Sequence, residues 1–283
     1  MMPGVMQDAF SYCAELVRST DRDRFIATLF APVQRRPGLH ALCAFNLEVA
    51  RVRDFAREAM PGEIRLQWWR EVLQRQREGE ASASPAAAAL LSTIEAHRLP
   101  VNVFLTLIEA RRFDLYNEPM LTVAELEDYA IKTSSALFEM AAQVLGADGA
   151  AVARPAGIAY ALTGLLLALP KHAARRQLYL PLQLLESHGL GPEDVFGAHS
   201  SAPLNTAVAE LRSVVRRHLD AAAEMLRRSL PQQALPAFLP IALVRPSLDR
   251  LERSDIFAPS ELSPWRRQWL MWRAAQNLSR LAG

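Results

Sequence analysis

The chain of 283 residues carries 32 basic and 30 acidic side chains, and 51% of its residues are hydrophobic. This apolar content is enough for a buried core and excludes intrinsic disorder of the whole chain. The formal charge of +2 excludes a strong overall positive field of the kind that draws proteins onto nucleic acid. We therefore expect no nucleic-acid partner, and we expect basic pairs such as Arg216–Arg217 to lie on solvated helix faces.

Apolar residues recur at helical spacing along almost the whole chain, and no stretch shows the sustained alternation of a strand. The pattern predicts an all-α protein. Helices are expected at residues 5–18, 21–31, 37–58, 62–78, 85–97, 101–115, 122–145, 150–169, 181–188, 204–229, 236–252 and 264–281. No internal repeat is visible, so we expect residues 1–283 to form one domain.

Turn and cap residues support these boundaries. Thr122 followed by Glu125 predicts a capping box at the head of one helix, and Gly146 is placed to end it. Small and polar residues predict loops at 79–89 and 189–203. Prolines are tolerated in the first helical turn, and seven of them fall where helices are expected to begin: Pro37, Pro61, Pro85, Pro100, Pro155, Pro181 and Pro264.

The most apolar run is GIAYALTGLLLAL, at residues 157–169, between Pro155 and Pro170. It is shorter than the roughly 20 residues that a bilayer-spanning helix needs. We therefore expect a buried helix here.

The first 25 residues include Asp8 and Glu15 and match neither a secretory signal nor a transit peptide. Cys13 and Cys43 are far apart and form no paired motif, which is typical of a reducing compartment. We expect a cytoplasmic protein without a disulfide framework.

Common catalytic motifs are missing from the sequence. The six His residues form no i, i+4 zinc pair, and there is no P-loop, GxGxxG or GxSxG pattern. Asp54 and Glu58 have a spacing that is used to hold Mg²⁺ against diphosphate. However, Arg51, Arg53 and Arg57 surround them and would oppose a divalent ion. A salt-bridged helix face is the favoured interpretation.

Four collinear segments lie between about residues 21 and 190: RFIATLFAPVQRRPGLHALCAFNLEVARVRDF, PGEIRLQWWREVL, RRFDLYNEPMLTVAELEDYAIKTSSALFEMAAQVLG and RRQLYLPLQLLESHGL. Together they resemble the squalene/phytoene synthase family. The resemblance implies the all-α isoprenoid synthase fold in a single domain. In the catalytic members, two aspartate-rich motifs on facing helices bind Mg²⁺, and two prenyl diphosphates are joined head to head.

The first aspartate-rich motif departs from the family pattern. It is approximately AFCRxxDDxxD in the enzymes, whereas residues 44–54 read AFNLEVARVRD. Ala50 and Arg51 therefore stand at the paired acidic positions, and only Asp54 remains.

The second motif, approximately QLTNxLRDxxxD in the enzymes, departs further. Residues 161–172 read ALTGLLLALPKH, which puts Ala168 and His172 at the acidic positions. Pro170 is expected to disturb the helix that carries the motif. Because metal ions neutralise the departing diphosphate, the resemblance implies a protein without this catalysis and without a metal cofactor.

The segment LPKHAARRQLYLP, at residues 169–181, resembles the non-catalytic branch of the family, typified by a mitochondrial complex I assembly factor. The resemblance implies a complex I subunit or a co-assembly factor as partner, in the cytoplasm or loosely at the inner membrane. A prenyltransferase that requires Mg²⁺ and an isoprenoid- or lipid-binding protein are the alternatives.

Several residues are candidates for a pocket or a partner surface. Arg51 and Asp54 are expected to form an inward-facing salt bridge, with a surface pair as the alternative. His172 is expected to lie opposite them as a hydrogen-bonded structural residue. Arg175 and Arg176 are candidates for binding an anion or an acidic partner, although a solvated loop is equally compatible.

Aromatic residues provide further candidates. Trp68 and Trp69 are adjacent on a helix and point about 100° apart, so we expect one in the core and the other at a pocket wall or a partner. Tyr179, in the LYLP segment, is another pocket candidate.

Three tryptophans follow one another at i, i+4 and i+7 near the C-terminus: Trp265, Trp269 and Trp272. We expect this helix to close the core. Contact with a membrane interface or with a partner protein is the alternative.

Overall fold

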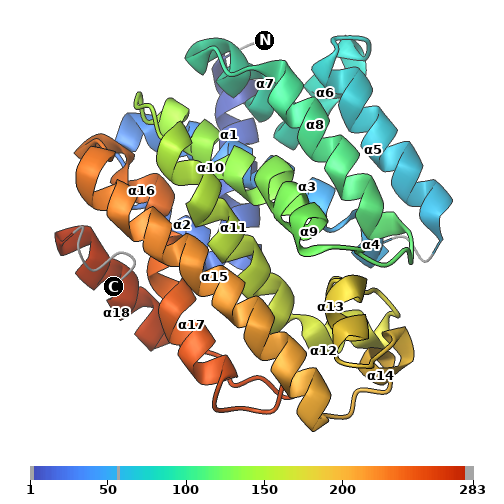
Figure 1. Cartoon of the computed structure of the whole chain (residues 1–283). Coiled ribbons are helices and arrows are strands. Elements are labelled where there is room, and N and C mark those ends of the chain that lie inside the picture. The colour runs from blue at the N-terminus through green and yellow to red at the C-terminus, as the bar shows by residue number, and fades with distance from the viewer. Residues whose placement is uncertain (1–2, 56–57, 278–283) are drawn as a thin grey trace. The chain divides into compact units, whose positions relative to one another are not determined.

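The computed structural model describes residues 3–55 and 58–277, and within these ranges the chain contains helices and connecting segments but no strand (Figure 1). The all-α prediction is confirmed. The chain divides into two compact units. Unit 1 comprises Met1–Leu115, Ala136–Ala150 and Leu230–Phe238, and unit 2 comprises Tyr116–Ser135, Ala151–Ser229 and Leu239–Gly283. The expectation of a single domain stays a prediction.

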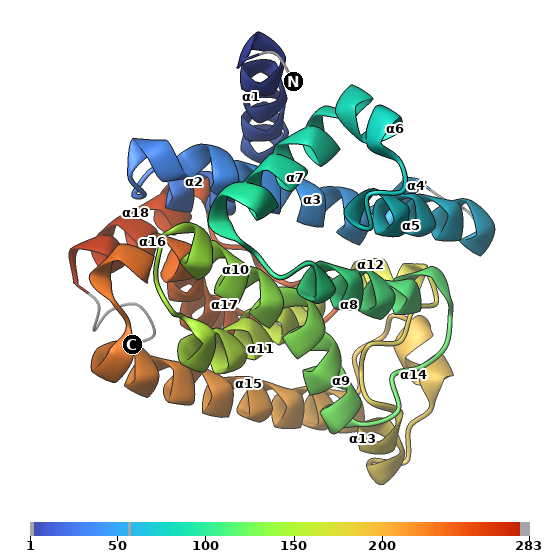
Figure 2. The same cartoon turned by 90° about the horizontal axis from the view of Figure 1, so that it is seen from above.

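The helices of unit 1 are α1 (Pro3–Thr20), α2 (Arg22–Thr28), α3 (Arg36–Ala50), α4 (Val52–Phe55), α5 (Ala59–Leu73), α6 (Glu78–Ala83), α7 (Pro85–His97), α8 (Val101–Arg111), α10 (Ala136–Val144) and α16 (Leu235–Phe238). Short 3₁₀ turns lie at η1 (Val33–Arg35), η2 (Arg112–Leu115) and η4 (Gln232–Ala234). Figure 2 shows α1 crossing both α3 and α7, and these three helices pack on one another.

The core of unit 1 is built around aromatic rings. Phe45 lies edge-on to Trp69, with ring centroids 5.1 Å apart, and edge-on to Phe104 at 5.4 Å. All three side chains are buried. Helix α7 contributes a buried run of alanines from Ala86 to Ala89, and these small side chains let its backbone approach its neighbours closely.

The helices of unit 2 are α9 (Val123–Ala130), α11 (Ala150–Leu167), α12 (Leu169–Ala174), α13 (Leu182–Ser187), α14 (Pro192–Phe196), α15 (Ala202–Ser229), α17 (Val244–Leu251) and α18 (Pro264–Gln276), with a π segment η3 (Ile131–Ser135) and a 3₁₀ segment η5 (Leu239–Leu243). The long helix α15 buries one stripe, which includes Leu211, Val215 and Leu219. It packs against α13 and α17.

Many predicted boundaries are confirmed within one or two residues. The N-cap at Thr122 forms as expected, but the reciprocal bond of the capping box goes to the preceding residue. The Thr122 hydroxyl accepts the Glu125 N–H at 3.1 Å, while the Glu125 carboxylate accepts the Leu121 N–H at 2.9 Å. Gly146 has φ +81°, as the residue after a helix end often requires.

Four predicted helices are interrupted. The helix predicted at 37–58 breaks after Ala50, the one at 122–145 contains η3, the one at 150–169 breaks at Ala168, and the one at 236–252 contains η5 between α16 and α17. Pro170 then lies in the first turn of α12, where its missing N–H costs no hydrogen bond. Pro155 was expected to begin a helix, but it lies inside α11, close enough to the start that few backbone bonds are lost.

Two predicted loops contain short helices. Helix α6 begins one residue before the loop predicted at 79–89 and ends inside it, and α14 lies within the loop predicted at 189–203. The polar composition of both segments hid these helices because each is only one to two turns long. The last helix, predicted at 264–281, is described to Gln276, and positions 278–281 lie outside the described residues.

Among the described residues, one helix, α11, is long and apolar enough to cross a membrane by length and composition alone. It extends the apolar run at 157–169 toward the N-terminus. More than half of it is buried inside the protein, which agrees with the expectation of a buried helix.

Candidate functional site

The first group of candidate residues lies in unit 1, where α3 ends and α4 begins. Arg51 caps α3, and its N–H donates to the Leu47 carbonyl at 3.2 Å. The Asp54 N–H in turn donates to the Arg51 carbonyl at 2.9 Å. The helix therefore restarts at once, and Arg51 and Asp54 share one short turn.

Arg51 and Asp54 form an ion pair, with Arg51 Nε 3.6 Å from Asp54 Oδ2. Their side chains are 39% and 23% exposed. The expected pair therefore forms, and both side chains are partly buried. Whether the pair faces the interior stays a prediction.

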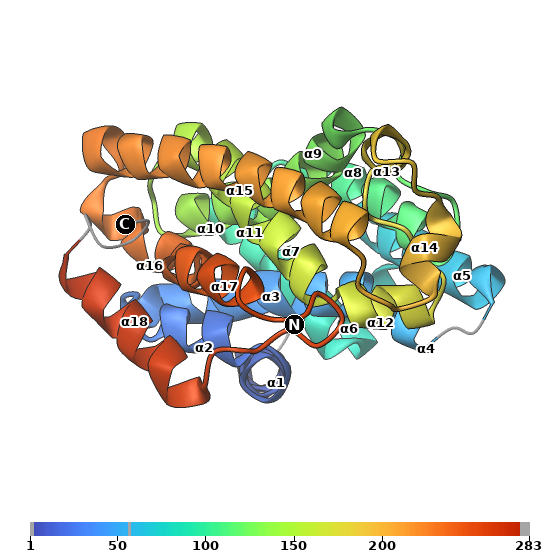
Figure 3. The same ribbon diagram turned by 60° about the horizontal axis from the view of Figure 1, so that its bottom comes forward.

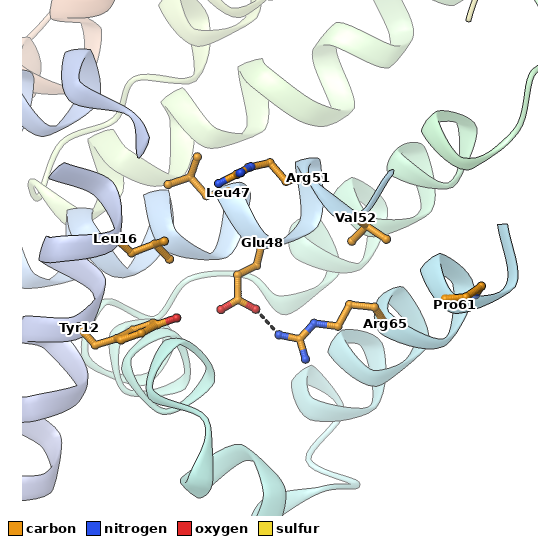
Figure 4. Close-up of a pocket in the computed structure, with 8 residues that line it drawn as sticks. All are labelled: Tyr12, Leu16, Leu47, Glu48, Arg51, Val52, Pro61 and Arg65. Atoms are coloured by element: carbon orange, nitrogen blue, oxygen red, sulfur yellow. Dashed lines mark hydrogen bonds and ion pairs between the residues drawn. The ribbon is translucent and has the colours of Figure 1, made fainter. Parts of the chain in front are cut away.

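A pocket of about 440 Å³ lies beside this turn (Figure 4). It is lined by Tyr12, Leu16, Leu47, Glu48, Arg51, Val52, Pro61 and Arg65. These residues come from α1, from the α3–α4 junction and from α5. Half of the lining is aliphatic, so the pocket suits an apolar or amphipathic group better than a bare anion.

The polar side of the pocket is nearly neutral. Tyr12 and Arg65 lie on either side of the Glu48 carboxylate, which forms an ion pair with Arg65 (Figure 4). Burial and then the Glu48 charge raise the pKa of Tyr12 above its usual value. The phenol is therefore a neutral hydrogen-bonding group at pH 7 and not a base.

Trp68 and Trp69 divide as their spacing predicts. Trp69 is fully buried against Phe45. Trp68 is partly buried, its indole N–H donates to Glu80 at 2.9 Å, and the Arg65 guanidinium lies 4.5 Å from its ring centroid. Trp68 thus packs against the pocket residue Arg65 without lining the pocket itself.

The second group lies in unit 2, around α12. Ala168 is the N-cap of α12, and His172 lies in its last turn. The His172 carbonyl accepts the Arg175 N–H at 3.0 Å and the Gln177 N–H at 2.9 Å. The His172 ring lies 4.6 Å from the ring of Tyr179. His172 is therefore packed within its own unit, and its expected role as a hydrogen-bonded structural residue stays a prediction.

Tyr179 and the two arginines differ in exposure. Tyr179 is buried and also faces Tyr129, with ring centroids 6.0 Å apart. Arg175 and Arg176 are exposed. Arg176 forms an ion pair with Glu193, and its guanidinium lies 4.7 Å from the ring centroid of Phe196. Arg176 thus connects the end of α12 to α14 through these two contacts.

The structure brings Arg51 and Asp54 together in unit 1, and His172 and Tyr179 together in unit 2. The expectation that His172 lies opposite Arg51 concerns two different units and stays a prediction. Among residues 3–55 and 58–277, no group of three or more His, Cys, Asp or Glu side chains is placed to hold a metal ion.

Of the eight lining residues, only Arg51 was predicted from the sequence, and the missed polar ones are Tyr12, Glu48 and Arg65. Glu48 shares a helix face with Arg51 through the i, i+3 spacing, and this signal was available. Tyr12 and Arg65 come from other helices, and only the packing of α1 and α5 brings them to Glu48.

Comparisons with known proteins show the family and the fold of the chain. The family described as squalene/phytoene synthase matches residues 17–273. A solved structure of a dehydrosqualene synthase in complex with ligand has a TM-score of 0.80 at 14% identity, covering 96% of this chain and 97% of that chain. The expected isoprenoid synthase fold is confirmed.

Two relatives are informative because they carry different names. A protein of Rattus norvegicus named "NADH dehydrogenase (ubiquinone) complex I, assembly factor 6" is 32% identical over 265 residues, which cover 91% of this chain and 78% of the relative. A 15-cis-phytoene synthase of Synechocystis is 22% identical over 268 residues, covering 88% of this chain and 78% of the relative.

Proposed function

The chain belongs to the squalene/phytoene synthase family, and we propose that it acts in the assembly of respiratory complex I and does not join prenyl diphosphates. The observation that carries the proposal is the contrast between the two relatives. Over nearly the same share of this chain, identity is 32% to the relative named as a complex I assembly factor and 22% to the phytoene synthase.

The donor set at the motif positions supports the same proposal. Ala50 and Ala168 offer no ligand, and the Arg51 guanidinium is a cation. Asp54 is the one carboxylate that remains from the two motifs, and it already pairs with Arg51 at 3.6 Å. Mg²⁺ prefers several oxygen ligands in octahedral geometry. These residues do not fit a magnesium–diphosphate cluster, so we propose that the protein works without a metal cofactor.

Ionisation of a prenyl diphosphate needs positive charge that neutralises the leaving group as it departs. The pocket in unit 1 does not provide this charge, because Glu48 neutralises Arg65 and Asp54 neutralises Arg51. We therefore propose that the protein acts by binding a partner and not by catalysis. Its partner would be a complex I subunit or a co-assembly factor, met in the cytoplasm or at the inner membrane.

Two measurements together test the proposal. The first compares assembled complex I, by native gel and NADH–quinone reductase activity, in cells with and without this gene. We expect a loss of the assembled complex that the wild-type gene restores.

The second measures pyrophosphate release from farnesyl diphosphate and Mg²⁺ by the purified protein, with an active squalene synthase as positive control. We expect no release. Turnover that requires Mg²⁺, together with normal complex I in the deleted strain, would overturn the proposal in favour of a prenyltransferase.

A further inference from the structure

Helix α18 (Figure 3) lies at the C-terminal end of unit 2. It exposes three large aromatic side chains on one face. Trp265, Trp269 and Trp272 are 81%, 50% and 54% exposed. The opposite face, with Met271 and Ala274, is buried, and the helix packs on η5. The helix therefore closes the core as expected, but the tryptophan stripe points away from it, which corrects the simpler prediction.

The stripe is unusual for a surface. Residues at i, i+4 and i+7 of a helix lie on one face, so the three indoles form one continuous apolar strip. A protein seldom exposes large aromatic side chains together unless the patch meets a partner or a lipid surface. The indole also has a polar N–H, which suits the boundary between apolar chains and water.

The charges beside the stripe are positive. Residues 264–276 contain no acidic side chain, whereas Arg266 and Arg273 flank the tryptophans on one side. The Arg273 guanidinium lies 4.3 Å from the ring centroid of Trp269. The positive charge of Arg273 therefore lies directly beside the tryptophan stripe.

A pocket of about 520 Å³ adjoins the same side of α18. Arg266 lines it together with Arg250 and Arg253 from the end of α17 and the following turn, and Asp249 is the one acidic side chain in the lining. Arg250 is held in place, because its guanidinium donates to Ser260 Oγ at 3.0 Å and to the Glu261 carbonyl at 2.7 Å. The pocket thus presents guanidinium groups that suit phosphate oxygens.

We propose that the exposed face of α18 binds the surface of an anionic phospholipid bilayer. The three indoles enter the interface between headgroups and acyl chains, and Arg266 and Arg273 bind lipid phosphates beside them. The arginine-lined pocket receives a headgroup phosphate from the same leaflet. The positive flank is what selects a bilayer with anionic lipid. The inference goes beyond the proposed role in complex I assembly and does not depend on it.

The test uses the purified full-length protein and sedimentation with vesicles of phosphatidylcholine alone or of equal parts phosphatidylcholine and phosphatidylglycerol. We expect binding to the mixed vesicles that weakens with added salt. The variant W265A/W269A/W272A should lose about tenfold or more in affinity. The variant R266Q/R273Q should lose about fivefold for each arginine removed.

Matched variants control for general loss of apolar or basic surface. The variant M60S/I64S removes two side chains of unit 1 that are 67% and 64% exposed. The variant R227Q/R228Q removes two exposed arginines from α15 of unit 2. Both should bind vesicles as the wild type does, and circular dichroism should show that every variant is folded.

Three results would overturn the inference. The first is wild-type protein that ignores the mixed vesicles, and the second is a tryptophan variant that binds them as well as the wild type. The third is a tryptophan stripe that mediates self-association instead, seen as concentration-dependent dimers that the tryptophan substitutions abolish while vesicle binding is absent.

Discussion

Gly157 of α11 lies in backbone contact with Ser135, the last residue of the π segment η3. A β-carbon on Gly157 would lie 2.3 Å from the α-carbon of Ser135. The Ser135 hydroxyl also donates to the Arg154 carbonyl at 2.9 Å, which fixes η3 against the start of α11. Only glycine permits this approach of the two segments.

We expect Gly157→Ala to lower the free energy of unfolding by about 1–3 kcal/mol or more, because the added methyl group must push η3 away from α11. Gly164 on the same helix is the matched control. A β-carbon there meets no atom within 4 Å, so Gly164→Ala should raise stability by up to about 1 kcal/mol through helix propensity. Urea unfolding followed by circular dichroism measures both. Equal effects of the two substitutions would show that the contact with Ser135 carries no strain.

The Arg51–Asp54 pair provides a test of whether the junction of α3 and α4 is held by charge. Exposed ion pairs contribute less than about 1 kcal/mol, whereas breaking a buried pair costs about 3–5 kcal/mol. Since both side chains reach solvent, we expect a coupling energy below about 1 kcal/mol in a double-mutant cycle of R51A, D54A and R51A/D54A. A coupling energy of several kcal/mol would instead support the inward-facing pair that the sequence indicates.

His40 of α3 is a buried histidine that stays neutral at pH 7. Burial, and secondarily the charge of Arg36, lowers its pKa from 6.5 to about 4. Its Nε2 lies 2.8 Å from Thr28 Oγ1, and that hydroxyl already donates to the Phe25 carbonyl at 2.7 Å. The Nε2 atom must therefore carry the proton and donate to Thr28.

The lowered pKa makes stability depend on pH. Unfolded chains take up a proton on His40 as the pH falls below about 6.5, whereas the folded protein does so only near pH 4. The contribution of neutral His40 to the free energy of unfolding is therefore fully present above pH 6.5 and is lost toward pH 4. Between these values the free energy of unfolding falls by up to about 1.4 kcal/mol per pH unit. Urea titrations between pH 7 and pH 4.5 should show a smaller slope for His40→Gln than for the wild type. The exposed His199 provides the control, since His199→Gln should keep the wild-type slope. Identical slopes for His40→Gln and wild type would contradict this origin.

The fold was predictable wherever local sequence signals agreed. Helix α15 was expected at 204–229 and runs from Ala202 to Ser229, because its apolar stripe is long and regular. The N-cap at Thr122 and the turn at Gly146 could be predicted directly, since each depends on two or three neighbouring residues. The family resemblance then supplied the fold, which periodicity alone does not specify.

Pro170 indicated the break near Ala168, whereas the interruption at η3 was not predictable, because tertiary contacts hold it. Nothing in the apolar spacing distinguishes η3 from α-helix, and the segment is fixed by Ser135 meeting Arg154 and Gly157 across the unit. The candidate pocket shows the same limit. The sequence named Arg51 from its motif position, but Tyr12 and Arg65 reach Glu48 from separate helices.

Ligand binding separates the assembly role from both alternatives. A ligand that binds only the folded protein raises its melting temperature by mass action. An active prenyltransferase needs metal and diphosphate together, so Mg²⁺ with farnesyl thiodiphosphate should stabilise it, whereas an isoprenoid-binding protein should respond to farnesol without metal.

Because Asp54 is the single carboxylate at the motif positions and pairs with Arg51, we expect Mg²⁺ with farnesyl thiodiphosphate to shift the melting temperature of this protein by less than about 1 °C. A squalene synthase measured alongside should shift by several degrees. A comparable shift here that requires both components would identify a metal site outside the residues at the motif positions, whereas a shift with farnesol alone would support a lipid-binding role.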